Sequence, residues 1–253
     1  MSYVEVRGVK IGDGTPKICV PIVGKNREEI IQEARTFAQI PLDLVEWRVD
    51  WYEDVMQMEK VVETARELRE LLGEIPILFT LRTAKEGGEK EIKPQEYARI
   101  NEQMAGTGLV DLIDVEAFTG EEIVKEMISS IHKAGVKVVA SNHDFHKTPD
   151  QDEIVRRLCY MQEIGADIPK IAVMPQSKRD VLTLLAATEE MLTDHGQTPL
   201  ITMSMSATGV ISRLCGECFG SALTFGAASK ASAPGQIGVN DLKEVLDIIH
   251  KSL

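Results

Sequence analysis

The chain has 253 residues, close to the ~250 that a single (β/α)₈ barrel uses, and its hydrophobic (43%) and charged (27%) fractions are those of an ordinary folded protein. The formal net charge of −12 argues against nucleic acid and anionic membrane surfaces as partners, because both repel an acidic protein. No apolar run approaches the ~20 residues of a membrane span and the first residues have no apolar signal core, so we expect a cytoplasmic protein.

Short runs rich in Ile, Val and Leu alternate along the whole chain with longer amphipathic stretches, which is typical of repeated βα units around a buried parallel sheet. The expected strands are Ile18–Val23, Leu42–Arg48, Ile75–Leu81, Val110–Glu116, Val136–Ser141, Lys170–Val173, Leu200–Met203 and Ala222–Phe225. The expected helices are Arg27–Phe37, Met58–Leu72, Pro94–Ala105, Glu121–Lys133, Asp152–Ile164, Arg179–Leu192 and Asp241–Lys251. Strands and helices that alternate without a linker or repeat predict an α/β fold in which residues 1–253 form one (β/α)₈ TIM barrel, rather than a doubly wound sheet.

Two segments depart from the regular βα pattern. The leading segment Tyr3–Ile11 falls outside the βα units, and we expect a short strand or hairpin that closes the bottom of the barrel. The helix of the seventh unit, near Val210–Cys218, has the weakest pattern. Asn26, Thr119 and Asp150 each precede an expected helix and are the residue types that cap helix N-termini.

Polar side chains gather where the apolar runs end. These residues are Glu46, Arg48, Asp50, Arg82, Lys85, Glu86, Asp114, Glu116, Asn142, His143 and Asp144, and Lys170 opens the sixth expected strand. Catalytic groups of barrel enzymes come from the carboxyl ends of several strands and from the loops that follow them. The pattern therefore predicts one site assembled from most of the sequence.

Two pairs of these charges allow a structural interpretation as well. Side chains alternate along a strand, so Glu46 and Arg48 share one face, as do Asp114 and Glu116. An ion-pair network in the barrel mouth would also satisfy such buried charges. For Asp114 and Glu116 the two interpretations stay open, whereas for Glu46 and Arg48 we favour substrate contact.

Lys170 is the candidate nucleophile. It precedes the apolar run Ile171–Val173, so we expect an ammonium group in largely apolar surroundings, where loss of solvation exposes the neutral amine for attack on a carbonyl. A buried structural ion pair is the alternative. His143, on the neighbouring strand end, favours the catalytic interpretation, because a neutral imidazole beside an imine could remove the proton α to it and return a proton to a leaving hydroxyl.

Cysteines and histidines give no metal or redox prediction. The cysteines stand in apolar or helical contexts that fit reduced thiols: Cys19, Cys159, Cys215 and Cys218. Cys215 and Cys218 have CxxC spacing, but no second pair at zinc spacing accompanies them, so we expect neither a metal nor a redox site. His143 and His146 are spaced for a metal-binding helix but follow a strand, so no metal site is predicted there either.

Several longer motifs resemble those of the type I 3-dehydroquinate dehydratases, and the likeness covers essentially the whole chain in the same order of elements. The motifs are EWRVD at 46–50, LFTLRTAKEGGE at 78–89, LVDLIDVE at 109–116, SNHDF at 141–145, GADIPKIAVMPQ at 165–176, ITMSM at 201–205, GVISR at 209–213 and SAPGQI at 232–237. The resemblance implies a TIM-barrel lyase of the shikimate pathway that converts 3-dehydroquinate to 3-dehydroshikimate by syn elimination of water, with no metal or organic cofactor. It also implies a homodimer.

The resemblance further implies the roles of individual residues. Lys170 would form an imine with the C3 ketone, His143 would move a proton from C2 to the departing C1 hydroxyl, and Glu86 would orient or tune His143. Arg213 would hold the substrate carboxylate through its two-pronged guanidinium group. The remaining substrate-binding residues would be Glu46, Arg48 and Arg82, which hold ring hydroxyls and brace Lys170, and Ser232 and Gln236, which belong to a lid over residues 228–236.

The chain departs from the family pattern at Pro21, where some members carry a serine able to touch the ligand; proline has neither the hydroxyl nor a backbone N–H.

Two other functions are alternatives to a dehydratase on this fold. A class I aldolase would also use a barrel lysine, but no Gly-rich phosphate-binding turn follows the last strands. A non-catalytic scaffold on the same fold would be expected to lose Lys170, His143 or Glu86, and the chain has all three.

Overall fold

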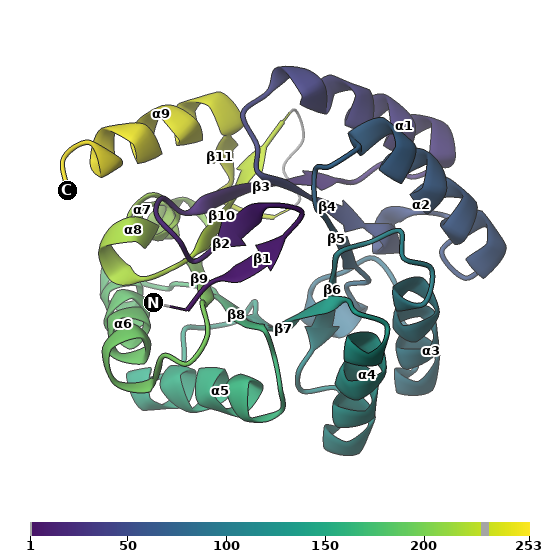
Figure 1. Ribbon diagram of the computed structural model, residues 1–253. Helices are drawn as coiled ribbons and strands as arrows, with labels where there is room; N and C mark the ends of the chain where they lie inside the picture. Colours follow the sequence, from purple (N-terminus) through teal and green to yellow (C-terminus); the bar gives the residue numbers. More distant parts are fainter. Residues whose placement is uncertain (1, 229–232) are drawn as a thin grey trace.

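The computed structural model describes residues 2–228 and 233–253, in which helices surround a ring of strands (Figure 1). The strands are β1 (Val4–Val6), β2 (Val9–Ile11), β3 (Lys17–Ile22), β4 (Leu44–Arg48), β5 (Ile77–Thr80), β6 (Leu112–Glu116), β7 (Lys137–Asp144), β8 (Ile168–Val173), β9 (Ile201–Ser204), β10 (Leu223–Ala227) and β11 (Ile237–Gly238). The α-helices are α1 (Arg27–Thr36), α2 (Met58–Leu72), α3 (Pro94–Ala105), α4 (Glu121–Lys133), α5 (Gln151–Glu163), α6 (Lys178–Glu190), α7 (Ile211–Leu214), α8 (Gly216–Phe219) and α9 (Val239–His250). None of the helices in the described ranges is both long and apolar enough to cross a membrane.

The sheet closes on itself, which confirms the predicted barrel. Parallel pairing runs in the order β11, β10, β3, β4, β5, β6, β7, β8, β9. Between β9 and β10 the ring is completed by a bridge of Leu200 with Ser221 and a hydrogen bond of 2.8 Å from the Ala222 N–H to the Leu200 carbonyl. The hydroxyl of Ser221 also accepts from the Thr202 N–H at 3.0 Å. A side chain therefore takes part in the closure, as the Asp43 carboxylate does where it accepts from the Ile18 N–H between β3 and β4.

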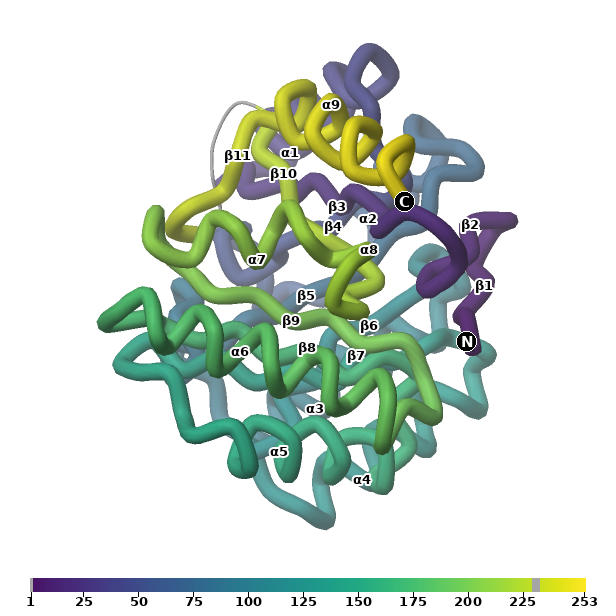
Figure 2. Tube along the Cα trace, turned by 90° about the vertical axis from the view of Figure 1, so that its left-hand side faces the viewer, coloured from purple at the N-terminus to yellow at the C-terminus, as the bar shows by residue number. Residues whose placement is uncertain are grey.

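The N-terminal hairpin covers one end of the barrel, as predicted for Tyr3–Ile11. Strands β1 and β2 pair antiparallel, with Val4 opposite Ile11. Val4, Val6 and Ile11 share an apolar cluster with the first residues of several barrel strands, among them Leu44 and Leu112. Figure 1 shows the hairpin crossing the middle of the ring, and Figure 2 shows it at one end of the barrel. This end is filled by hydrocarbon, which leaves the opposite end for polar groups.

Alternation along the strands separates the two faces of the sheet. In β4, Val45 and Trp47 belong to the apolar core between strands and helices, whereas Leu44 belongs to the cluster inside the barrel. Glu46 and Arg48 continue the inward-facing series toward the carboxyl end of the strand. Along β4 the inside of the barrel thus changes from apolar to charged.

Local boundaries differ from the sequence prediction in a few places. Strand β8 begins two residues earlier, at Ile168, because the extended backbone runs through Pro169, so Lys170 lies within the strand rather than at its start. Strand β7 continues to Asp144 and therefore includes His143. The seventh helix is divided into α7 and α8 at Cys215.

Of the predicted caps, only one forms the expected side-chain hydrogen bond. Asn26 accepts from the Glu29 N–H at the start of α1. Asp150 occupies the N-cap position of α5 without such a bond, and Thr119 is not a cap, because Gly120 with φ of 145° takes that position before α4. The sequence prediction missed Ser177, which forms a reciprocal capping box with Asp180 at the start of α6.

Candidate active site

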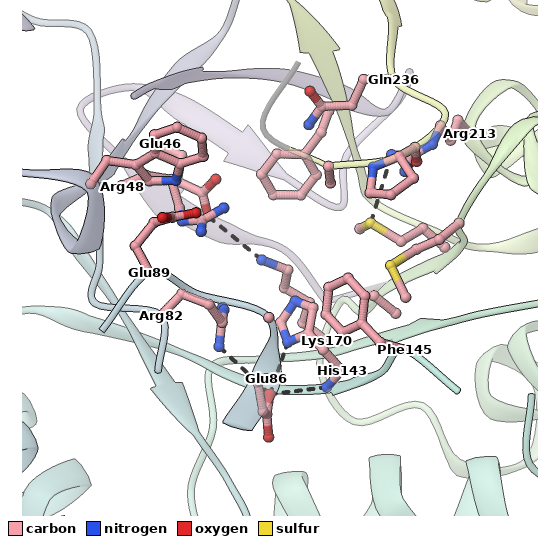
Figure 3. A pocket seen from close by; sticks show the side chains of 18 residues that line it. Glu46, Arg48, Arg82, Glu86, Glu89, His143, Phe145, Lys170, Arg213 and Gln236 are labelled. Atoms are coloured by element: carbon pink, nitrogen blue, oxygen red, sulfur yellow. Dashed lines mark hydrogen bonds and ion pairs between the residues drawn. The ribbon is translucent and has the colours of Figure 1, made fainter. Parts of the chain in front are cut away.

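A pocket of about 180 Å³ lies at the carboxyl ends of the barrel strands (Figure 3). Its lining comes from β4, β7, β8, β9, β10 and α7 and from the segments that follow β4, β5, β7, β9 and β10. The lining residues are Glu46, Arg48, Trp51, Arg82, Glu86, Gly87, Glu89, His143, Phe145, Lys170, Ala172, Met203, Met205, Arg213, Phe225, Ala233, Pro234 and Gln236. All predicted site residues except Ser232 therefore meet in this pocket; Ser232 lies outside the described residues.

Lys170 is almost fully buried, with 3% of its surface exposed. Its Nζ lies 3.3 Å from Asp114 Oδ2, 3.7 Å from Glu46 Oε1 and 4.6 Å from the centre of the Phe225 ring. The expectation of largely apolar surroundings is wrong, because β6 and β4 each direct a carboxylate toward the amine. The amine is thus held between two anions and an aromatic face.

Arg82 links the charges behind Lys170. Its guanidinium lies 2.8 Å from Asp114 Oδ2 and 3.1 Å from Glu116 Oε1, and it donates to the Ser141 hydroxyl at 2.9 Å. Glu116 also accepts from the N–H and the hydroxyl of Thr83 at 2.8 and 2.7 Å. Glu116 therefore belongs to a structural network, whereas Asp114 belongs both to that network and to the surroundings of Lys170.

These contacts set the pKa values of the network. Burial by itself raises the pKa of Asp114, but the positive charges of Arg82 and Lys170 outweigh it and hold that pKa below its ordinary value. Burial likewise disfavours the charged form of Arg82, but Asp114 and Glu116 raise the pKa of Arg82 well above its ordinary value. Both groups of the Arg82–Asp114 pair are therefore ionised at neutral pH.

Glu86 and His143 form a hydrogen-bonded pair. Glu86 Oε2 lies 2.9 Å from His143 Nδ1 and accepts from the His143 backbone N–H at 2.9 Å, while Oε1 accepts from the Asn142 amide at 3.2 Å. The second ring nitrogen of His143 points into the pocket, toward the Lys170 amine (Figure 3). The carboxyl group of Glu86 thus contacts both the ring and the backbone of His143 and leaves the second ring nitrogen free.

The pKa values of this pair are shifted in opposite directions. Burial raises the pKa of Glu86 from 4.5 to about 8, against the opposing charge of Arg82. Burial, together with the positive charges of Arg82, Lys170 and Arg48, lowers the pKa of His143 well below 6.5. The imidazole is therefore neutral at physiological pH, as a general base must be.

Arg48 and Glu46 also face the pocket, each with a partner of its own. Arg48 donates from Nε and Nη2 to the two carboxylate oxygens of Asp50, both at 2.8 Å. Glu46 accepts from the Thr80 hydroxyl at 3.0 Å. Both side chains are held in place before any ligand arrives, and each has hydrogen-bonding capacity left for a polar ligand.

Arg213 differs from the other buried arginines. Only 2% of its surface is exposed, and among the described residues no carboxylate forms an ion pair with it. Its Nη2 donates to the Pro234 carbonyl at 3.0 Å, its Nη1 lies 3.8 Å from the Met203 sulfur, and its Nε has no partner in the described ranges. Burial lowers its pKa to about 10, so it stays charged at neutral pH. An unpaired buried cation of this kind is a site for an anion.

The segment predicted to form a lid is described only in part. Gln236 and Pro234 line the pocket, and the Ser206 N–H donates to the Pro234 carbonyl at 3.2 Å. Pro21, where the chain departs from the family pattern, does not line this pocket. It pairs with Glu46 in the sheet and lines a separate surface cavity beside α1.

The sequence did not predict the apolar lining of the pocket or the contact of Asp114 with Lys170. Ala172, Met203, Met205 and Phe225 face the pocket because they continue the inward-facing series of β8, β9 and β10. Counting alternate residues from Lys170, Ile201 and Leu223 would have identified all four. For Phe145 only its nearness to His143 gave a signal.

The arrangement can bind an anion and perform proton transfer next to a carbonyl. A buried amine, a neutral imidazole fixed by a carboxyl group and an unpaired guanidinium line one cavity of small-molecule size. An amine forms imines with ketones, and a nearby imidazole can remove the proton α to such an imine.

Comparisons with known proteins agree with this chemistry. A family model described as Type I 3-dehydroquinase matches residues 18–253. A 3-dehydroquinate dehydratase of Clostridioides difficile (strain 630) is 56% identical over 250 residues and covers 99% of this chain and 98% of the relative. One of Listeria monocytogenes serovar 1/2a is 57% identical over 251 residues, covering 99% of each. A crystal structure of the type I enzyme from Clostridium difficile with covalently modified comenic acid has a TM-score of 0.97 at 56% identity and covers 100% of this chain and 99% of that one.

Proposed function

The chain belongs to the type I 3-dehydroquinase family, whose reaction is the third step of the shikimate pathway, and we propose that Lys170, His143 and Glu86 carry out its conversion of 3-dehydroquinate to 3-dehydroshikimate and water. The observation that carries this assignment is the meeting of the buried amine, the fixed neutral imidazole and the unpaired Arg213 in one pocket. Family membership sets aside the two alternatives, a class I aldolase and a non-catalytic scaffold.

Substrate binding begins at Arg213. Its guanidinium lacks an ion-pair partner among the described residues, so the substrate carboxylate can accept hydrogen bonds from it in the two-pronged geometry that arginine favours. Glu46, Arg48 and Arg82 line the opposite side of the pocket and bind the ring hydroxyls. Gln236, which lines the pocket, closes over the bound ring and excludes water. The other predicted lid residue, Ser232, lies outside the described residues.

Imine formation uses the neutral amine of Lys170. Its nitrogen attacks C3 of the ketone, and a C–N bond forms while the carbonyl oxygen becomes a hydroxyl. That hydroxyl takes up a proton and leaves as water, so the C3–O bond breaks and Nζ keeps one hydrogen in the resulting iminium. His143, the general acid–base nearest to Nζ, supplies and removes protons in these steps.

Elimination follows on the iminium. His143 removes the C2 proton, and the electron pair of the C2–H bond moves toward the iminium nitrogen, which accepts it far better than a ketone oxygen would. The C1 hydroxyl then leaves as water with the proton that His143 carries, on the same face of the ring. Hydrolysis of the imine releases the product. The imine is the electron sink, so these steps use no metal or organic cofactor.

Glu86 acts through His143. Nδ1 of the imidazole lies 2.9 Å from Glu86 Oε2, and we infer that Nδ1 carries the ring proton, because this tautomer leaves the second nitrogen free to accept the C2 proton. The backbone N–H of His143 binds the same carboxyl oxygen, which fixes the ring plane relative to the strand. The carboxyl group therefore selects the tautomer and the direction of the base.

Borohydride reduction tests the assignment directly. We expect intact-mass spectrometry, after sodium borohydride treatment with 3-dehydroquinate present, to show an adduct that peptide mapping places on Lys170. Lys170→Ala should give no adduct and lose at least about 10⁴-fold in kcat, because the covalent route is closed. Lys133→Ala, which changes an exposed lysine of α4, is the matched control and should behave as wild type. Turnover without an adduct in the wild type would contradict the imine mechanism.

Three wider proposals accompany this mechanism. We propose that residues 1–253 form one domain, since the β1–β2 hairpin lies outside the matched range 18–253 yet packs on the barrel strands. We also propose a cytoplasmic homodimer; all four cysteines are free, which fits a reducing compartment. Analytical ultracentrifugation tests the dimer, and a single monomeric species at micromolar concentration would refute it.

A further inference from the structure

We propose that Asp114 is a further catalytic residue, the counter-ion that holds the iminium of Lys170 in place and protonated. The inference rests on the proposed imine mechanism. It assigns a role to a carboxylate that is absent from the pocket wall, in contrast to Glu46, and that touches the reacting nitrogen directly.

The geometry places Asp114 behind the amine. Its Oδ2 lies 3.3 Å from Lys170 Nζ, and only 1% of its surface is exposed. The same oxygen lies 2.8 Å from Arg82, and the other oxygen accepts from the Ser141 hydroxyl at 2.6 Å. Three partners on two oxygens leave this carboxylate one orientation, so its distance to Nζ is fixed before substrate binds.

Glu46 is the other carboxylate near the amine, and its position suits a different task. It lies 3.7 Å from Nζ, accepts from the Thr80 hydroxyl and lines the pocket, where a ligand can reach it. Asp114 does not line the pocket and cannot bind a ring hydroxyl. Of the two carboxylates, only Asp114 is dedicated to Lys170 and its surroundings.

The ionisation state of Asp114 fits a counter-ion. The positive charges of Arg82 and Lys170 outweigh the effect of burial and keep its pKa below the ordinary value, so the carboxylate stays charged throughout the pH range of catalysis. A fixed negative charge in a site without solvent stabilises a neighbouring cation far more than it would in water.

Asp114 can act as the counter-ion from imine formation to elimination. When the C–N bond forms and water leaves, Nζ keeps one hydrogen and the iminium carries the positive charge. That N–H can donate to Asp114 Oδ2, which then keeps the proton on nitrogen while the C2–H electron pair moves toward it. Asp114 gains and loses no proton itself, so the step balances without a further reactant.

Other charges around Nζ must be counted in any test at varied pH. Besides Asp114, the titratable or charged groups around the amine and its base are Cys19, Glu46, Arg48, Arg82, Glu86 and His143. Removing the negative charge of Asp114 leaves the positive charge of the iminium less stabilised by its surroundings. The imine should then lose its proton at a lower pH than in the wild type.

The experiment compares Asp114→Asn with Glu116→Gln. Glu116 is the matched control, because it also pairs with Arg82 and is equally buried, but among the described residues it has no contact with Lys170. For each variant kcat, KM, the pH profile of kcat and the fraction trapped by borohydride are measured at saturating 3-dehydroquinate. Ser141→Ala is the second variant; it keeps the Asp114 charge and removes its 2.6 Å hydrogen bond.

For Asp114→Asn we expect kcat to fall about 100-fold with KM within about threefold, and the alkaline limb of the profile to move to lower pH. Ser141→Ala should lower kcat by about tenfold or less and should also move the alkaline limb to lower pH. This variant decides the question if Asp114→Asn fails to fold. An Asp114→Asn enzyme with wild-type kcat, or a Glu116→Gln enzyme with the same loss and the same pH shift, would overturn the inference. Absence of the adduct in the wild type would instead overturn the proposed function, and this inference with it.

Discussion

The buried charges are paired on one side of the pocket, whereas the buried arginine on the other side has no ion-pair partner among the described residues. On the side of β4, β5 and β6, the buried charges are paired: Arg48 with Asp50, and Arg82 with Asp114 and Glu116. On the side of β9 and β10, methionines and an aromatic ring line the pocket, and Arg213 has no ion-pair partner in the described ranges. We propose that the paired side fixes the positions and protonation of the reacting groups, whereas the unpaired cation determines which ligand can bind. Four predictions test this division.

Arg82→Gln should have the largest effect, on stability. It leaves two buried carboxylates without their cation, so the free energy of unfolding in urea should fall by about 3–5 kcal/mol. Arg156→Gln is the matched control, because it breaks an exposed ion pair with Glu153 and should cost less than about 1 kcal/mol. Equal losses in the two variants would mean that burial and pairing on this side are unimportant.

Arg213→Met should affect function and leave stability almost unchanged. Loss of the carboxylate-binding group should lower kcat/KM for 3-dehydroquinate by about 100- to 1000-fold. The free energy of unfolding should stay within about 1 kcal/mol of wild type or rise, because an unpaired buried charge is removed and the hydrocarbon is kept. A loss of stability as large as that of Arg82→Gln would show that the two sides do not differ in this respect.

The Glu86–His143 pair should make stability fall on the alkaline side of neutrality. Below pH 6.5 the two shifts act in opposite directions on stability, because folding raises the pKa of Glu86 and lowers the pKa of His143. Above pH 6.5 the unfolded chain has released both protons, while folded Glu86, with a pKa of about 8, keeps its own. The free energy of unfolding should therefore drop by about 2 kcal/mol between pH 6.5 and 8.

Urea titrations across this range provide the measurement. Glu86→Gln removes the titrating carboxyl group, so its stability should be flat where that of the wild type falls. The same slope in both proteins would assign the drop to other groups.

Cys218→Ser should have the smallest effect. Cys218 is exposed and Cys215 has a pKa raised by burial to about 11, which disfavours the thiolate that redox or metal chemistry needs. Activity should match wild type and the free energy of unfolding should change by less than about 0.5 kcal/mol. A change in kcat after mild oxidation of the wild type but not of Cys218→Ser would assign the CxxC pair a role.

The sequence predicted the barrel well, because buried parallel strands give apolar runs whose ends are marked by charged residues. It also placed Lys170, His143, Glu86 and Arg213 in one site, largely through motifs that resemble a known family. It could not tell how the charges pair. Asp114 and Glu116 lie two residues apart on the same face of one strand, yet Asp114 contacts Lys170 and Glu116 contacts Thr83. That difference depends on side-chain directions in neighbouring strands, which one sequence does not encode locally.

The surroundings of Lys170 were wrongly predicted for the same reason. Its own segment is apolar, but the groups nearest to its amine come from β4 and β6, more than 50 residues away along the chain. The division of the seventh helix at Cys215 and the cap at Gly120 also escaped prediction, because both depend on short backbone turns whose residues allow several conformations.

The pairing of β3 with β10 bears on how the protein is made. Roughly 200 residues separate these neighbours, so on a ribosome adding about 5–20 residues per second β3 waits about 10–40 s for the strand that covers its edge. During that interval Ile18 and Val20 lie on an exposed apolar edge strand, the kind of surface that recruits other nascent chains. The junction of β9 with β10, completed by the Ser221 side chain, likewise forms only after β10 has been made. Yield in the cell should therefore respond to chaperone supply more sharply than the stability of the finished barrel suggests.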